Sequence, residues 1–411
     1  MTASVVENRP QDSMAASKGK LVEPDLNFIR EISRLGGDSF KKCYQCATCS
    51  ATCPISPDDK PFPRKEMVWS IWGWKDHLIK DPDVWLCHQC NDCSAVCPRE
   101  GNPGDILAVI RKYSYLYYAF PKFMGKFLYE PKYLPIIAAL PFVILFVIVA
   151  LFGNFQPEGD IVFKKFLSHP FPLDFLFILV AMFALVSAAV GGMRFWKALQ
   201  EGPRPPVNNP RGFTAGLIEA VKEVATHKQF NECDKANPRF YSHLLTFYGF
   251  VALFITTSLV FLGLYLLDLE TPLPLLNPIK ILGNLGALAF LIGTGMMLYL
   301  RLTDEERAGK NSYNDWLFLG LMFGLAVSGV LTEALRLAGI AVAAYSMYFV
   351  HLALILSMMV YFPFSKFAHL LYRTLAIVYY HGYAASASEA KEALMENKQE
   401  LKDETVQPNA A

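Results

Sequence analysis

Two matched runs of four cysteines are the residues in this sequence best suited to chemistry. The first run is CYQCATCSATCP, from Cys43 to Pro54, and the second is CHQCNDCSAVCP, from Cys87 to Pro98. Both follow the spacing C-x2-C-x2-C-x3-C-P, in which three thiolates wrap one iron–sulfur cubane and the fourth ligates the other cluster, as in two-cluster ferredoxins. The spacing therefore predicts two [4Fe–4S] clusters that exchange their fourth ligands. The predicted sets are Cys43, Cys46, Cys49 and Cys97 for cluster 1, and Cys87, Cys90, Cys93 and Cys53 for cluster 2.

Structural zinc is the alternative use of these thiols. Tetrahedral zinc sites usually take two separated C-x2-C pairs rather than four crowded thiols followed by proline. Disulfide bonds are disfavoured in a reducing compartment, and eight of the nine cysteines lie between Cys43 and Cys97. The ninth, Cys233, stands apart and is expected to be a spare thiol.

Three histidines associated with apolar runs form the second candidate site. Ionisable side chains in a membrane are costly and usually functional, and imidazole is a suitable ligand for iron. We predict that His243 and His369 hold a b-type haem, and that His351 binds a second haem or a quinone. In an ideal helix His351 and His369 point the same way, about 27 Å apart, although Pro363 between them is expected to kink the helix. The alternative is that these histidines are merely hydrogen-bonded.

Membrane-spanning helices are the elements that must position the histidines. The chain is 53% hydrophobic and 14% aromatic, which is high for a soluble protein. Six apolar runs have the roughly 20 residues needed to cross a hydrocarbon core of about 30 Å, where the backbone must be helical. We place them at 133–153, 171–193, 243–267, 279–300, 315–337 and 342–364, the last continuing to about Tyr380.

The composition along the chain predicts a mainly α protein with two structured parts. An α-helical, ferredoxin-like domain with two clusters is expected to precede a bundle of six transmembrane helices. The net charge of +1 and the absence of a basic tract exclude nucleic acid as an expected partner. The predicted parts are a polar N-terminal extension over 1–34, the cluster domain over 35–125, a cytochrome b domain over 130–380 and a polar tail over 383–411.

The positive charges of the loops predict the orientation. The segment 194–239 carries eight Lys and Arg residues and the loop 301–310 carries three, against two in 154–170 and one in 268–280. Positive loops stay in the cytoplasm. The first 20 residues contain no apolar core of a secretory signal. We therefore expect a multi-pass protein of the cytoplasmic (inner) membrane, with the cluster domain and the C-terminus on the cytoplasmic side. In the positive segment, TAGLIEAVKEVATHKQF is expected to form a helix on the membrane surface.

Glu333 and Arg336 form a candidate quinone site near the outer end of the fifth span. They lie three residues apart in GVLTEALRLAG and therefore share a helix face. The functional interpretation makes Glu333 a proton acceptor and Arg336 a contact for a quinone or a haem propionate. The alternative is an interfacial ion pair whose side chains reach toward the polar boundary.

Together these motifs resemble the membrane component of the quinone-interacting membrane-bound oxidoreductases, known as their C subunit, which is a fusion of modules similar to the C and E subunits of heterodisulfide reductase. The most specific part is WLCHQCNDCSAVCPR, which is similar to the second cluster motif of the heterodisulfide reductase module. The last five spans are similar to the gamma subunit of respiratory nitrate reductase. That protein has a further histidine where this chain has Leu253, which puts a second bis-histidine haem in doubt.

The resemblance implies a subunit of a quinone-dependent oxidoreductase complex in the lipid membrane. It would relay electrons between the menaquinone pool and two cytoplasmic flavin and iron–sulfur subunits, similar to the A subunit of heterodisulfide reductase, through b haem and the two clusters. The implied final partner is adenylylsulfate reductase in sulfate respiration. The alternatives are a subunit of a heterodisulfide- or sulfite-linked membrane oxidoreductase and a non-catalytic membrane anchor.

Overall fold

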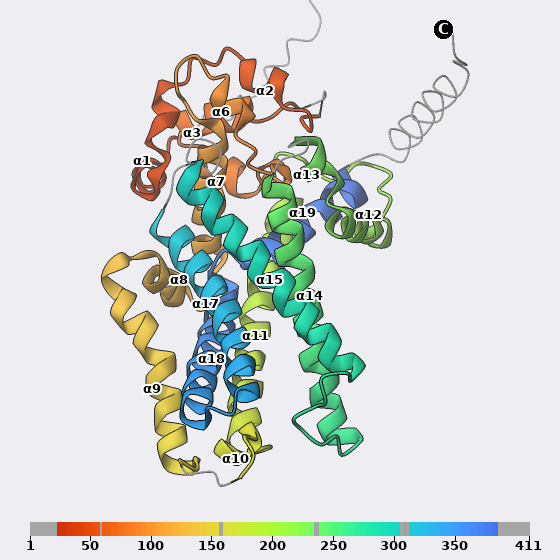
Figure 1. Ribbon diagram of the computed structural model, residues 1–411. Helices are drawn as coiled ribbons and strands as arrows, with labels where there is room; N and C mark the ends of the chain where they lie inside the picture. Colours follow the sequence, from red (N-terminus) through yellow and green to blue (C-terminus); the bar gives the residue numbers. More distant parts are fainter. Residues whose placement is uncertain are drawn as a thin grey trace, which may run out of the picture.

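The described residues of the computed structural model form helices and loops without a strand (Figure 1). They comprise residues 23–57, 60–155, 159–233, 238–304, 309 and 312–384. A helical N-terminal domain caps one end of a bundle of long helices. The predicted fold class, a mainly α cluster domain followed by a six-span bundle, is confirmed.

The N-terminal domain is built from short helices packed around one longer helix. Its long helix, α7, buries Ile106, Leu107 and Ile110 against the others. These elements are α1 (Leu26–Ile32), η1 (Ser33–Gly37), η2 (Asp38–Lys42), α2 (Thr48–Thr52), α3 (Arg64–Ile71), α4 (Lys75–Ile79), α5 (Asp83–Leu86), α6 (Asp92–Ala95) and α7 (Pro103–Tyr118).

The core of this domain continues into the membrane bundle. The Trp85 ring is 1% exposed and stacks on Tyr372, with ring centroids 5.2 Å apart, and it meets the edge of Phe195 at 5.5 Å. Tyr372 and Phe195 belong to helices of the bundle. Burial of such large rings contributes much of the packing energy of a core. The two parts are therefore joined by one continuous apolar core.

Among the described residues, six helices are long and apolar enough to cross a membrane, so the chain is a multi-pass membrane protein. Side chains such as Leu185 and Phe254 are 65% and 66% exposed, as expected for surfaces that face lipid rather than water. α8 (Lys122–Tyr129) and η3 (Pro131–Tyr133) lead from the cluster domain into the first span. The spans are α9 (Leu134–Phe152), α11 (Leu173–Gln200), α14 (Pro238–Leu266), α15 (Pro278–Thr303), α17 (Tyr313–Leu337) and α18 (Ala341–Tyr361).

The sixth span is interrupted where Pro363 predicts a kink. The α-helix ends at Tyr361, a short 3-10 turn, η4 (Phe362–Phe364), follows, and Ser365 is extended. The helix then resumes as α19 (Ala368–Tyr379) and ends in η5 (Tyr380–Ala384). The straight-helix relation between His351 and His369 therefore does not apply, because the break changes both their spacing and their relative direction.

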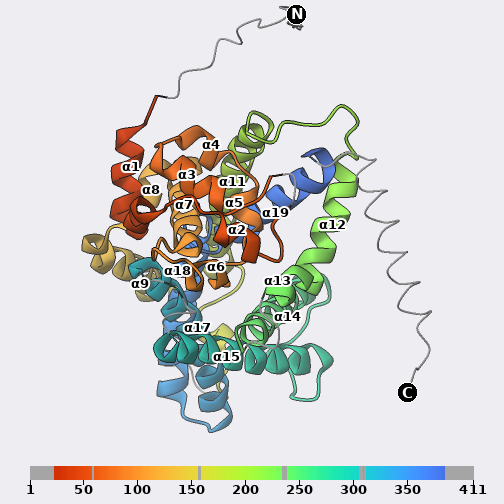
Figure 2. The same cartoon turned by 90° about the horizontal axis from the view of Figure 1, so that it is seen from above.

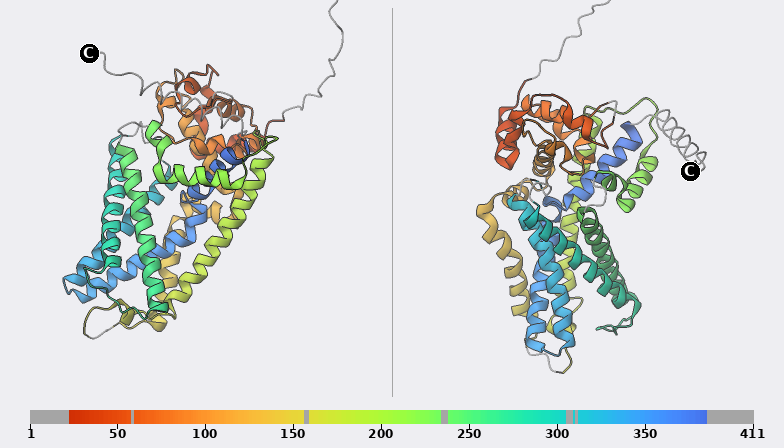
Figure 3. Two further views of the ribbon diagram at one scale, coloured as in Figure 1. Left: turned by 90° about the vertical axis from the view of Figure 1, so that its right-hand side faces the viewer. Right: turned by 45° about the horizontal axis from the view of Figure 1, so that its top comes forward.

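The connection between the second and third spans lies at the same end of the bundle as the cluster domain (Figures 1, 2 and 3). It contains α12 (Phe213–Thr226) and α13 (Lys228–Cys233), and α12 contacts α19 and η5. Ile218 and Val221 on α12 are 55% and 59% exposed, so this helix has the apolar outer face expected of a surface helix. The short α10 (Phe163–Phe166) lies at the opposite end.

Candidate redox sites

The two cysteine motifs repeat in backbone conformation as well as in sequence. Gln45 and Ala47 have φ of 59° and 68°, and the matching Gln89 and Asn91 have φ of 56° and 68°. Left-handed residues at these positions turn each loop tightly around its first three cysteines. Each loop then enters a short helix, α2 or α6, and these two helices contact each other.

Backbone N–H groups point at sulfur atoms in both motifs. Hydrogen bonds to cluster sulfurs raise the reduction potential of an iron–sulfur centre. The N–H groups of Gln45, Gln89 and Gly101 donate to the Sγ atoms of Cys43, Cys87 and Cys97 at 3.4, 3.3 and 3.2 Å. These donors suit thiolate sulfur, which is the form that binds iron.

The first set of thiols gathers around Cys49. Burial, with contributions from the nearby Cys43, Cys97 and Cys46, raises the pKa of Cys49 to about 11. Cys97 belongs to the second motif, so the fold places it among the thiols of the first. A buried thiol with such a high pKa needs an adjacent cation to become a thiolate at neutral pH, and iron supplies that charge.

The second set of thiols lines a single cavity. Cys53, Cys87, Cys90 and Cys93 all lie on its wall, although Cys53 belongs to the first motif. Burial, with contributions from Cys87 and Cys90, raises the pKa of Cys53 to about 12. Both groupings have the donors that a [4Fe–4S] cluster requires. They support the predicted exchange of fourth ligands, which stays a prediction.

Cys233 is a fifth thiol in the cavity that the second thiol set lines. The side chain is 6% exposed, lines the same wall as Cys90, and hydrogen-bonds to Cys90 so that the pKa of Cys90 is lowered. The structure thus places Cys233 beside the thiols of the second set, although it stands apart from them in the sequence, and its role as a spare thiol stays a prediction. No spacing in the sequence could have found this position, because α13 reaches the cavity only through the packing of the 201–240 connection.

His243 and His369 lie close enough to interact electrostatically, on different helices at the cluster end of the bundle. The Nδ1 atom of His369 lies 2.6 Å from the carbonyl oxygen of Lys366, to which it donates. That bond leaves Nε2 available, as in most metal-bound histidines. The buried Nδ1 atom of His243 has no hydrogen-bond partner in the part of the chain that the structure describes. Both residues thus fit an axial role at a haem iron.

His227 is a third imidazole at this site, and sequence reasoning missed it. It ends α12 in a left-handed conformation, with φ of 52°, and its ring centroid lies 5.0 Å from that of His243. Its buried Nδ1 atom also lacks a partner among the described atoms. His227 is therefore an alternative partner for His243. Nothing in its local sequence marks it, because it lies outside the apolar runs.

His351 packs against α17 in the interior of the bundle. Its Nδ1 atom lies 2.9 Å from the hydroxyl of Ser328, which itself donates to the carbonyl of Leu325 at 3.2 Å. The imidazole therefore donates through Nδ1 and keeps Nε2 free. A Cβ atom at Gly329 would lie 3.0 Å from the ring, so glycine permits this close approach. These contacts fit either a ligand role or the hydrogen-bonded alternative.

A short series of rings connects the second thiol set with the histidines. His88 follows Cys87 directly and stacks on Phe230 with centroids 5.4 Å apart, and Phe230 meets His243 at 5.5 Å. Burial and the charge of Arg373, whose Nη2 atom lies 3.0 Å from Nδ1, lower the pKa of His88 well below its usual value. His88 is therefore neutral at physiological pH.

Glu333 and Arg336 form an ion pair that also includes Lys280. The Arg336 Nη2 atom lies 3.2 Å from Glu333 Oε1, and Lys280 Nζ lies 2.7 Å from Glu333 Oε2. The ion pair between Lys280 and Glu333 thus connects α15 to α17. The predicted quinone role of Glu333 and Arg336 stays a prediction, since these contacts are also those of an interfacial ion pair.

A buried acidic group in the cluster domain has the donor atoms of a metal site, but it already contains two cations. Ligand atoms of Glu66, Asp81 and Asp83 lie within 4.8 Å of one another. Lys65 Nζ lies 2.9 Å from Asp81 and 3.4 Å from Glu66, and it also bonds Asp83. Arg204, from the connection after α11, lies 2.9 Å from Asp83. This group is an ion network that joins the domain to the bundle.

Known sequence families match both parts of the chain. The 4Fe-4S dicluster domain matches residues 39–100, so this part is an iron–sulfur electron-transfer module. The C subunit of the H(2):CoB-CoM heterodisulfide,ferredoxin reductase from Methanothermobacter marburgensis is 36% identical over 63 residues, which cover 15% of this chain and 34% of that protein. Its counterpart from Methanothermobacter thermautotrophicus has the same identity and coverage. The predicted similarity to the C subunit of heterodisulfide reductase is confirmed for this module.

The membrane part matches a different family. Citrate utilization protein B of Escherichia coli is 29% identical over 296 residues, which cover 66% of this chain and 73% of that protein. No solved structure matches the chain. The model of the family described as citrate utilization protein B matches residues 170–390, which is more than half of the chain. The chain therefore belongs to the citrate utilization protein B family.

Proposed function

We propose that the chain relays electrons between a membrane menaquinone and cytoplasmic flavin and iron–sulfur subunits. The observation that carries this proposal is the continuous series from the second thiol set through His88 and Phe230 to His243. One-electron carriers held at the two ends of such a series can exchange electrons across a membrane boundary. Oxidation of one quinol releases two electrons to the relay and two protons to water.

The proposed cofactors are two [4Fe–4S] clusters and one b haem, which supply one-electron redox chemistry when bound. His243 and His369 would hold the haem, and the Lys366 carbonyl would fix the ring of His369. His351 is proposed to bind a second haem or a quinone. Glu333 and Arg336 are kept as the outer candidates for quinone contact.

The soluble partner has two candidates. The resemblance of the cluster motifs favours proteins similar to the A subunit of heterodisulfide reductase, with electrons delivered to adenylylsulfate reductase. Membership in the citrate utilization protein B family favours a soluble oxidoreductase of citrate utilization instead. Affinity purification of the tagged membrane complex, followed by mass spectrometry of stoichiometric subunits, distinguishes the two.

The proposed orientation puts the cluster domain in the cytoplasm. The lysine- and arginine-rich connection lies at the same end of the bundle as that domain, in agreement with the positive-inside rule (Figure 3). A fluorescent protein fused to the C-terminus is expected to fluoresce, whereas a C-terminal alkaline phosphatase fusion is expected to be inactive. The reverse pattern contradicts the orientation.

Absorption spectroscopy of the anaerobically purified chain tests the relay. We expect the α-band of a b-type cytochrome, reducible by menadiol, and its loss in His243→Ala and His369→Ala. The variant His227→Ala decides whether the third imidazole is a ligand, and we expect it to retain the haem. His77→Ala, in the cluster domain, is the matched control. A chain without haem that leaves menadiol unoxidised is a non-catalytic anchor and contradicts the proposal.

His351→Ala tests the second haem. Haem extraction that gives two haems per chain in the parent and one in His351→Ala supports a second haem at this residue. One haem in both proteins leaves His351 with a quinone or packing role.

A further inference from the structure

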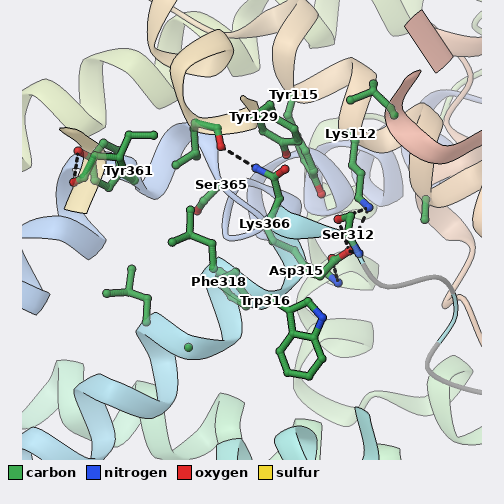
Figure 4. A pocket seen from close by; sticks show the side chains of 18 of the residues that line it. Lys112, Tyr115, Tyr129, Ser312, Asp315, Trp316, Phe318, Tyr361, Ser365 and Lys366 are labelled. Carbon is green, nitrogen blue, oxygen red and sulfur yellow. Dashed lines mark hydrogen bonds and ion pairs between the residues drawn. The ribbon is translucent and has the colours of Figure 1, made fainter. Parts of the chain in front are cut away.

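A cavity of about 520 Å³ lies where the cluster domain meets the membrane helices (Figure 4). Elements α7 and α8 contribute one side, and α9, α17, α18 and the segment after η4 contribute the other. The volume falls within the range of about 300 to 1,000 Å³ typical of small-molecule sites. The described part of its lining contains no histidine, cysteine or methionine, so these usual axial ligands of haem are not supplied there.

One end of the cavity carries two lysines that share a single carboxylate. Asp315 accepts from Lys112 Nζ at 3.0 Å and from Lys366 Nζ at 2.9 Å, and Ser312 lies 2.8 Å from Lys112 (Figure 4). Asp315 is 6% exposed, whereas the Lys366 side chain is 43% exposed although it lines the cavity. An ammonium has three N–H donors. Lys366 therefore has donors left for an acceptor oxygen of a ligand.

Most of the remaining wall is apolar. Leu128 from α8, Ile137 and Phe142 from α9, and Leu321 and Leu354 from α17 and α18 line it. Because three of these helices are membrane spans, the apolar wall lies beside the lipid-facing part of the bundle. The cavity thus suits an amphipathic ligand with acceptor oxygens at one end and a hydrocarbon tail at the other.

The cavity also adjoins the second thiol set. Gln89 lines both this cavity and the cavity formed by Cys53, Cys87, Cys90 and Cys93. Arg111, which also lines the larger cavity, donates to the carbonyl oxygen of Cys87 at 2.8 Å and to the side-chain oxygen of Gln89 at 3.3 Å. A ligand head group here would be separated from the proposed cluster 2 by the Gln89 loop. That position favours a redox-active ligand over a structural lipid.

We propose that this interface cavity binds the head group of a membrane quinone, with Lys366 donating to a ring carbonyl and the isoprenoid tail along the apolar wall. The proposal rests on the quinone named in the proposed function and assigns it a different position from Glu333 and Arg336, neither of which lines this cavity. This position gives the quinone a route to cluster 2 that does not pass through the haem, in addition to the ring series to His243.

Binding of a quinolone N-oxide inhibitor to the detergent-purified chain tests this position. Loss of a charged hydrogen bond predicts a Kd about tenfold higher in Lys366→Met. Gly320 also lines the cavity, and a Cβ atom there meets nothing within 4 Å, so Gly320→Leu extends into the space without a first-atom clash. We expect a similar increase in Gly320→Leu and a much smaller one in Gly320→Ala. Lys222→Met, on exposed α12, is the control and should bind normally.

A second measurement reports where the inhibitor binds rather than how tightly it binds. Saturating inhibitor should perturb the electron paramagnetic resonance signal of cluster 2 in the parent protein, and at an inhibitor concentration near the parent's Kd this perturbation should be much smaller in Gly320→Leu. Unchanged Kd in both Lys366→Met and Gly320→Leu, at normal iron content, overturns the proposal. So does an increased Kd in Glu333→Gln alone, which places the quinone at the outer pair. Loss of a copurified phospholipid from Lys366→Met with unaltered inhibitor binding identifies a lipid site instead. A protein without haem that still binds inhibitor in this cavity refutes the relay through haem but not the cavity.

Discussion

At the scale of single residues, the predicted exchange of fourth cysteines is the most specific feature of the chain. The structure brings Cys97 to the first thiol set and Cys53 to the second, because helices α2 and α6 pack against each other. In the predicted assignment, each motif supplies the fourth ligand of the other motif's cluster. The duplicated sequence is expected to hold its two clusters in a mutually dependent arrangement.

The variant Cys53→Ser should therefore damage cluster 2, while Cys43→Ser damages cluster 1. We expect electron paramagnetic resonance of the reduced proteins to show different signals lost in the two variants. Cys233 lies in the second cavity and could replace the missing thiol, so Cys53→Ser/Cys233→Ser is measured beside the single variant. Loss of the same signal in Cys43→Ser and in the double variant shows that the assignment is wrong.

Cys233 offers a second prediction at this scale. Its hydrogen bond to Cys90 should favour the more negative, reduced form of cluster 2. A hydrogen bond of about 1 kcal/mol corresponds to roughly 40 mV for one electron, so Cys233→Ala should lower the midpoint potential of cluster 2 by about that amount. Redox titration measures it, with cluster 1 as the internal control. An unchanged potential shows that Cys233 has no hydrogen bond to the loaded cluster.

At the scale of elements, the ion network around Asp83 joins the cluster domain to the connection after α11. Burial and the neighbouring Asp81 together raise the pKa of Asp83 to about 6, although Lys65 and Arg204 act in the opposite direction. The folded protein therefore binds more protons than the unfolded chain between about pH 4 and pH 6. The contribution of Asp83 to stability accordingly falls as the pH rises through this window, and Arg204 offsets part of that loss.

The variant Arg204→Met should destabilise the protein mainly above about pH 6, where Asp83 is charged. Breaking a buried ion pair costs roughly 3 to 5 kcal/mol, and the cost should decrease as the pH falls and Asp83 becomes protonated. Circular dichroism during thermal unfolding at about pH 5 and about pH 7.5 measures this difference. Arg211→Met, from the same connection, is the control. An equal loss at both pH values means that Arg204 does not act through the Asp83 charge.

At the scale of the whole molecule, the chain is a redox module fused to a membrane bundle through a shared apolar core. The Trp85, Tyr372 and Phe195 rings pack against one another at that junction, and Tyr115, which meets the edge of Trp85, lines the interface cavity. The arrangement brings the proposed redox centres to one end of the bundle. From there the spans continue through the lipid to the opposite end of the bundle.

Metal analysis of the full chain checks this architecture. Two [4Fe–4S] clusters require about eight non-haem irons and about eight acid-labile sulfides per chain. Cys49→Ser should reduce both to about four if the other cluster survives, with Tyr44→Phe, in an exposed part of the same loop, as the control. Stoichiometric zinc, or four or fewer irons in the parent protein, contradicts the presence of two clusters.

Several features could be predicted because their physical cause is local in the sequence. About 20 consecutive apolar residues must form a helix in lipid, which is why the six predicted spans overlap the six long helices, with ends that differ by at most seven residues. Pro363 marked the break in the sixth span because proline cannot continue a helical hydrogen-bond ladder. The C-x2-C-x2-C-x3-C-P spacing identified a dicluster domain because the ligands of each cubane come largely from one tight loop.

Only the tertiary structure decided which distant residues share a site. Cys233 and His227 lie on the 201–240 connection, and they reach the second thiol set and His243 because α12 and α13 pack at the cluster end of the bundle. The lysine pair around Asp315 and the cavity beside Gln89 likewise combine α7, α17 and the segment after η4. Such contacts depend on how helices far apart in the chain pack together. The residue pattern within one helix does not specify which other helices it packs against.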